Sequence, residues 1–165
     1  MSRIIGIDPG TQKMGWAIVE GGNTILNYGW INAGSLNYEV RIPTIIYELE
    51  KSYREYKCTD IAVERAIRWN GRQIAALETL CQAIRVWSKR VNPQRKIGEY
   101  NVSEWKSNML GNYRANAEFT QRTIEALFPR LKRDLPEHIH DAIYIAMYHH
   151  KKTILKVQND LKSNL

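Results

Sequence analysis

The sequence is poor in cysteine and has no long hydrophobic run. Its only two cysteines, Cys58 and Cys81, do not lie in a CxxC or another metal-binding spacing. We therefore expect two reduced, partly buried thiols, and neither a disulfide framework nor a zinc-thiolate site. No apolar stretch reaches the length that spans a bilayer, and no basic, apolar leader indicates secretion. These absences predict an intracellular protein that does not enter a membrane.

Acidic residues are the second shortage. Asp and Glu number 17 against 24 Lys and Arg, which gives a formal net charge of +7 and a pI near 9.5. This surplus favours a polyanionic partner, with nucleic acid the leading candidate, although a moderately basic housekeeping protein would have the same composition. The five tryptophans and nine tyrosines could stack on bases. Aromatic side chains usually serve the core first, however.

The spacing of apolar residues predicts one α/β domain without internal repeats or linkers, since 165 residues suit a single core. The expected strands are residues 3–8, 14–20, 24–33, 59–64 and 95–100, and the expected helices are 37–56, 71–91, a short helix between Ser103 and Gly111, 115–128, and a last helix from about Pro136. The first helix suggests a crossover into a parallel position. We expect a five-stranded mixed sheet with helices on both faces, a domain of residues 1–157, and a frayed polar tail over 158–165.

Two of these strands end on a carboxylate, because "IIGID" finishes at Asp8 and "DIAVE" at Glu64. If the strands are parallel neighbours, both acids emerge at the same carboxyl edge, where open α/β sheets bind their ligands. Unpaired acids raise each other's pKa, and a divalent cation removes that cost. Either acid alone would suggest a helix cap or a surface salt bridge. Their corresponding positions favour a metal site.

The expected last helix offers a third contributor. His138 and Asp141 are three residues apart and face the same way, and alone they would suggest a solvated helix start. Together with Asp8 and Glu64 they complete a cluster dominated by oxygen, which suits Mg²⁺ or Mn²⁺ better than Zn²⁺. Two such ions could clamp the attacking water and the leaving oxygen of a phosphodiester. A zinc site built on His138, His140 and Asp141 is the weaker alternative, because no cysteine supports it.

Four segments then carry a resemblance: "IIGIDPGTQKMGWAIVE", "IAVERA", "EYNVSEWK" and "IHDAIYIAMYHH". In this order they resemble the RuvC family of Holliday junction resolvases, over nearly the whole chain. The resemblance implies a ribonuclease H-like single domain and a metal-dependent endodeoxyribonuclease that nicks four-way junctions symmetrically. It also implies two Mg²⁺ ions per active site, with Mn²⁺ as a substitute, held by Asp8, Glu64, His138 and Asp141. Many members carry Asp where this chain has His138, and some carry His.

The same resemblance implies roles for basic and aromatic residues. Lys106 matches a cation near the scissile phosphate, where it could stabilise charge in the transition state. The family's junction wedge falls near Ile67, which is not aromatic, and Trp69 two residues later is our candidate instead. The remaining candidate phosphate contacts are Arg68, Arg72 and Arg114. A solvated cation is the plain alternative for each, and helix-start packing is the alternative for Trp69.

The resemblance further implies a homodimer on branched DNA, in the cytoplasm or associated with the nucleoid. The second long helix would pack at the dimer interface through the stripe from Ile74 to Ile84, which would also serve the core. Three alternatives remain open at this point. They are a non-catalytic branched-DNA-binding module on this fold, a related nuclease with broader branched-substrate or RNA specificity, and an actin-like ATPase or sugar kinase suggested by "DPGT". The last class uses two such domains.

Overall fold

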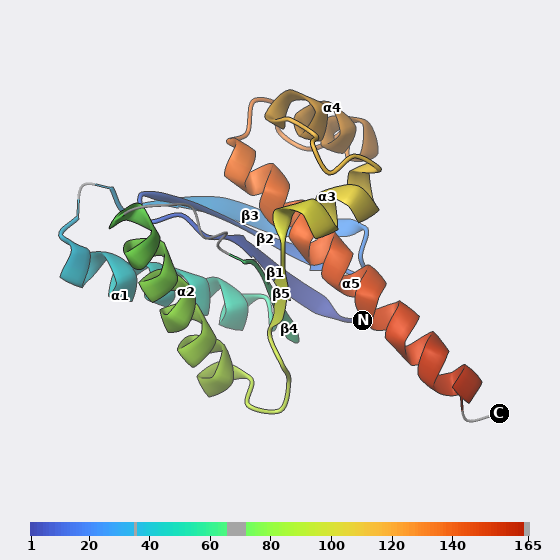
Figure 1. The fold of residues 1–165 in the computed structure, drawn as a ribbon, viewed down its shortest axis with the longest axis horizontal. Coiled ribbons are helices and arrows are strands. Elements are labelled where there is room, and N and C mark those ends of the chain that lie inside the picture. Colours follow the sequence, from blue (N-terminus) through green and yellow to red (C-terminus); the bar gives the residue numbers. More distant parts are fainter. Residues whose placement is uncertain (35, 66–71, 164–165) are drawn as a thin grey trace.

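The structure, a computed structural model, describes residues 1–34, 36–65 and 72–163, and leaves the side chains at positions 38 and 72–74 undescribed. Its centre is a mixed sheet with the strand order β3-β2-β1-β4-β5 (Figure 1). The strands are β1 (Arg3–Asp8), β2 (Lys13–Glu20), β3 (Thr24–Asn32), β4 (Asp60–Glu64) and β5 (Gly98–Tyr100). β1 is antiparallel to β2 and parallel to β4, and β4 is parallel to β5. The predicted five-stranded mixed sheet is confirmed, with a shorter fifth strand than expected.

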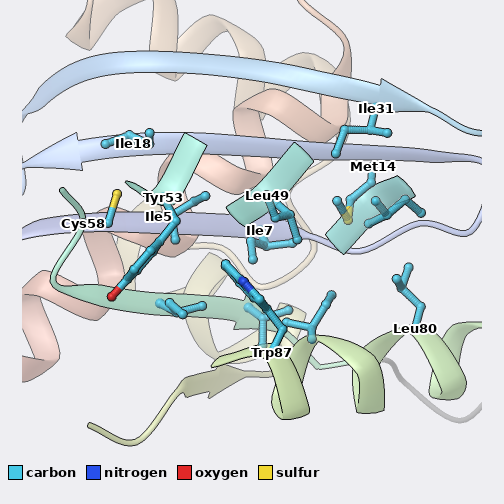
Figure 2. Packing of buried hydrophobic residues seen from close by; sticks show 14 of the residues in the cluster. Ile5, Ile7, Met14, Ile18, Ile31, Leu49, Tyr53, Cys58, Leu80 and Trp87 are labelled. Carbon is cyan, nitrogen blue, oxygen red and sulfur yellow. The ribbon is translucent and has the colours of Figure 1, made fainter. Parts of the chain in front are cut away.

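Two helices cover one face of the sheet and three cover the other (Figure 1). The helices are α1 (Tyr38–Glu55), α2 (Arg72–Val91), α3 (Val102–Leu110), α4 (Ala117–Leu127) and α5 (Glu137–Ser163). α1 and α2 pack over Ile5 and Ile7 of β1, where Leu49 and Trp87 fill the space between helices and sheet (Figure 2). Both cysteines are buried and form no disulfide, as the sequence predicts. No helix in the described ranges is long and apolar enough to cross a membrane.

The apolar stripe of α2 faces this core and not the outside. Leu80 and Ile84 are both 0% exposed and belong to the same buried cluster as β1. The expectation that this stripe forms a dimer interface is therefore wrong for its described part, because the chain's own sheet already covers it. The exposed side of α2 carries Thr79, Gln82 and Val86 instead.

α5 lies on the other face, and two glycines let its first turns approach the sheet closely. A Cβ atom at Gly6 of β1 would stand 2.1 Å from the carbonyl oxygen of Ala142. A Cβ atom at Gly15 of β2 would stand 2.1 Å from the carbonyl oxygen of His138. Only a residue without a side chain fits at such distances. The start of α5 is therefore seated directly on the sheet, beside the end of β1.

Helix ends differ from the expectations in three places. α3 begins after Asn101, so Ser103 lies within its first turn and does not cap it, whereas Gly111 ends the helix with a φ of 67° as expected. The side chain of Asn116 caps α4 by accepting a hydrogen bond from the Phe119 amide. α5 continues to Ser163, where we expected a frayed tail from Gln158, and its last turns are exposed. The division into a domain and a tail stays a prediction.

Candidate active site

The parallel pairing of β1 and β4 places two carboxylates at one edge of the sheet. Ile7 pairs with Val63, so Asp8 and Glu64 follow together at the carboxyl ends of the two strands. Asp8 is only 8% exposed. Burial raises the pKa of Glu64 to about 8, and the charge of Asp8 adds to that rise. The two acids therefore destabilise each other's charged forms, as expected for a shared site.

The first turn of α5 brings His138 and Asp141 to the same edge. His138 Nδ1 donates to Asp8 Oδ2 at 2.5 Å, and this hydrogen bond raises the pKa of the imidazole. Burial raises the pKa of Asp8, and the bond with His138 opposes that rise. Burial and the charge of Asp8 raise the pKa of Asp141 to about 7. The structure thus gathers the four candidate ligands, which come from three separate elements.

Trp105 and Glu137 also act on this cluster, although neither was expected from the sequence. Trp105 is completely buried, and its Nε1 donates to Glu64 Oε2 at 2.8 Å. This hydrogen bond lowers the pKa of Glu64 and so opposes the larger rise that burial causes. The charge of Glu137 raises the pKa of both Asp8 and Asp141. In the sequence, the only indication that Trp105 belongs to the site is that it precedes the candidate Lys106. For Glu137, the indication is that it precedes His138.

Lys106 is a buried cation beside the acids. Its charge lowers the pKa of Asp8, of Glu64 and of Asp141. Its Nζ donates to the carbonyl oxygen of Ala115 at 3.0 Å, and stands 5.3 Å from the centre of the Trp105 ring. The ammonium group therefore balances part of the local negative charge and fastens the loop before α4. A direct contact with a phosphate stays a prediction.

The oxygen-rich donor set fits a hard divalent cation, although the side chains do not converge on a common coordination point. Asp141 Oδ1 is buried and has no hydrogen-bond partner among the described residues. Three acids with raised pKa values would be relieved by a cation, and oxygen-rich sets are typical for Mg²⁺. In the described part of the chain, however, no three His, Cys, Asp or Glu side chains are arranged to hold a metal ion as they stand. The fit therefore rests on donor chemistry and on the uncompensated charge.

The zinc alternative finds no support in this arrangement. His140 is buried, and burial lowers its pKa, while the charges that act on it come from Glu125 of α4 and from Glu137. His140 thus lies near Glu125 of α4, and its spacing of two from His138 places it on another side of α5.

The candidate DNA contacts are only partly visible. Arg68 and Trp69, together with Ile67, lie outside the described residues, and Arg72 begins α2 with an undescribed side chain. Arg114 is exposed and lies 5.1 Å from the ring of Tyr113. It lines a hollow of about 310 Å³ at the start of α4, together with Arg122. Arg114 is thus accessible to a phosphate, and the other three contacts stay predictions.

Comparisons with known proteins identify relatives of this chain. A family model described as crossover junction endodeoxyribonuclease RuvC matches residues 4–149. The crossover junction endodeoxyribonuclease RuvC of Alkaliphilus oremlandii (strain OhILAs) is 29% identical over 150 residues, which cover 88% of this chain and 91% of that protein.

Two solved structures share the fold. Thermus thermophilus RuvC in complex with Holliday junction substrate gives a TM-score of 0.79 at 16% identity, covering 94% of this chain and 96% of that one. The yeast mitochondrial Holliday junction resolvase Ydc2 gives a TM-score of 0.58 at 14% identity, covering 99% of this chain and 86% of that one. These likenesses confirm the predicted ribonuclease H-like fold.

Proposed function

This chain belongs to the RuvC family of crossover junction endodeoxyribonucleases, since the family model matches residues 4–149, and on that premise we propose that it resolves four-way DNA junctions by paired symmetric nicks. The observation that carries the proposal is the meeting of Asp8, Glu64 and Asp141 at one edge of the sheet, where burial and mutual repulsion raise their pKa values. A protein that only bound DNA would gain nothing from clustered acids that face phosphates.

Membership of this nuclease family implies dependence on a divalent metal. We propose Mg²⁺, with two ions per active site and Mn²⁺ as a substitute, held by Asp8, Glu64, His138 and Asp141. When bound, Mg²⁺ would supply an activated water and stabilise charge on the phosphodiester. Because Nδ1 of His138 is engaged by Asp8, Nε2 is the ring nitrogen that remains for a ligand.

Neighbouring side chains support these four in the proposed site. Trp105 holds one oxygen of Glu64 and thereby orients its carboxylate. Lys106 keeps positive charge beside the acids in a buried setting, where it acts more strongly than in water. We assign Lys106 to stabilising charge on the scissile phosphate, and Arg114 to a phosphate contact at the start of α4.

Paired nicks require two active sites, so we propose a homodimer. Leu80 and Ile84 are buried within the chain, so they are not available for contact with a second copy.

The test is a cleavage assay on a synthetic four-way junction, with the wild type and Asp8→Asn side by side in Mg²⁺. We expect paired nicks from the wild type, no nicks from the variant, and the same junction affinity for both in EDTA. Three-way and flap substrates in the same assay measure how selective the enzyme is. Equal Mg²⁺-dependent cleavage by both proteins would refute the assignment of the site, and junction binding without any cleavage by the wild type would identify a non-catalytic binding module.

A further inference from the structure

A basic groove runs along the open edge of the sheet, away from the carboxylates described above. It lies between α2 and the edge strand β5 and has a volume of about 980 Å³. Its described lining contains a single acid among five cations. These charged residues are Arg65, Arg85, Lys89, Arg95, Lys96 and Glu99.

The acids near the groove are already neutralised from within the chain. Arg85 donates through Nε and Nη2 to the two carboxylate oxygens of Glu99, and the Arg65 guanidinium stands 3.9 Å from the same group. Arg95 Nη1 donates to both oxygens of Asp60 at 2.6 Å. A guanidinium has five N–H donors, so both engaged arginines keep donors for a ligand in the groove.

The lysines of the groove differ from these arginines. Among the described residues, Lys89 and Lys96 make no ion pair, and Lys89 is exposed in the last turns of α2. The groove therefore combines guanidinium groups that carboxylates hold in place with ammonium groups that are free to move. Fixed forks and point charges together are typical of surfaces that bind a phosphate backbone.

The groove also has the length and the position of a backbone track. Arg65 directly follows Glu64 at the carboxylate edge, whereas Arg95 binds Asp60 at the first residue of β4. A strand of five residues spans about 17 Å at about 3.3 Å per residue. Measured along the helix axis, that length corresponds to about five base-pair steps of duplex DNA, at about 3.4 Å per step.

We propose that this groove binds the phosphodiester backbone of a duplex arm that leads away from the cleavage edge. The proposal rests on the proposed function, because it takes branched DNA as the ligand. Five of the six charged residues that line the groove are cations, which suit phosphates, so the contact is independent of base sequence. It adds affinity and orientation for the arm, and leaves the chemical step to the carboxylates.

The double variant Lys89→Gln/Lys96→Gln tests the groove, with Lys51→Gln/Lys156→Gln as a control of equal charge change on exposed sites elsewhere. Junction affinity is measured in EDTA at several salt concentrations. Removal of two phosphate contacts should make the negative slope of log K against log salt shallower by about 1.8, while the control keeps the wild-type slope. Lys89→Arg/Lys96→Arg should restore the slope.

The outcomes separate this proposal from its premise. Equal slopes for the double variant and its control would overturn the groove, even where the wild type cleaves junctions. The proposal would also be overturned if the slope became shallower only because the double variant sediments as a monomer. The groove would then be part of an interface with a second copy. A wild type that binds through the groove and never cleaves would defeat the proposed function alone.

Discussion

The two ends of β4 carry carboxylates with opposite electrostatics. At its first residue, burial raises the pKa of Asp60, but hydrogen bonds from His149, Arg95 and Thr59 outweigh it and hold that pKa well below its usual range. At its last residue, burial and Asp8 raise the pKa of Glu64 to about 8, and only Trp105 and Lys106 oppose them. A strand of five residues thus carries at one end an acid, Asp60, whose charge has partners that stabilise it. At the other end it carries Glu64, whose charge the surroundings destabilise.

This contrast indicates that the Asp60 edge of the sheet contributes to stability and the Glu64 edge to function. At the Asp60 edge, cationic and hydroxyl partners convert a buried acid into a link between β4 and the segment before β5. At the Glu64 edge the neighbours are mostly other acids, which costs folding free energy and prepares the edge for a cation. Loss of an acid should therefore destabilise the protein at one edge and inactivate it at the other.

The largest expected effect is on catalysis at the Glu64 edge. Glu64→Gln removes a candidate metal ligand, so we expect junction cleavage to fall by about 10³-fold or more. Thermal unfolding without metal should occur at the same temperature or higher, because a repelling charge is gone while Trp105 keeps an oxygen to bind. A clear loss of thermal stability together with the lost activity would erase the contrast between the edges.

The matched change at the other edge should reverse this pattern. Asp60→Asn leaves Arg95 without its carboxylate, and we expect the free energy of unfolding to fall by about 2 kcal/mol in urea titrations. The figure stays below the usual cost for a buried pair because the Arg95 side chain is 53% exposed and solvent screens its charge. Cleavage per folded molecule at saturating junction concentration should match the wild type, and a large drop in that rate would contradict the division.

Trp105 is expected to orient the carboxylate at the Glu64 edge. Trp105→Phe removes the donor to Glu64 Oε2 and keeps an aromatic ring beside Tyr144, on which Trp105 stacks at 6.0 Å. We expect the Mg²⁺ concentration for half-maximal cleavage to rise about tenfold, as for loss of a residue that orients a ligand. Trp87→Phe, in the opposite core, is the control for simple loss of packing, because Trp87 Nε1 has no hydrogen-bond partner among the described residues. An unchanged Mg²⁺ requirement would reduce Trp105 to a core residue.

The smallest effect is the pH dependence of stability at the Asp60 edge. Because the pKa of Asp60 is lower in the folded state than in the unfolded chain, its contribution is present above about pH 4 and is lost as the pH falls. The difference in unfolding free energy between the wild type and Asp60→Asn should shrink by about 1 kcal/mol from about pH 6 to pH 3. A constant difference would mean that Asp60 contributes packing and not charge.

The sequence predicts the carboxylate edge well because short-range patterns determine it. An apolar strand that stops at Asp8, another that stops at Glu64, and a helical spacing of three from His138 to Asp141 suffice to bring these groups together. The mixed sheet follows from the same local signals. Such patterns predict where a strand or helix ends, and the ends are where this site lies.

What the sequence does not reveal depends on partners far along the chain. Asp60 resembles an ordinary polar residue at the start of a strand, and its link to Arg95, 35 residues away, has no local signal. Likewise, the tryptophan that binds Glu64 lies 41 residues from it. The stripe of α2 looked equally suited to a core and to a dimer interface, because periodicity gives a face but not the surface that covers it.

The seating of α5 on the sheet has a consequence for how this enzyme can vary. Gly6 and Gly15 set the height of the helix above β1 and β2 through the hydrogen atom that each carries in place of a side chain. A single added methyl group at either position would lift His138 and Asp141 from Asp8 without touching any charged residue. Which substitutions the active site tolerates thus depends on the space between the main chains of α5 and the sheet. A mutational survey limited to the acidic and basic residues would miss Gly6 and Gly15, which align them.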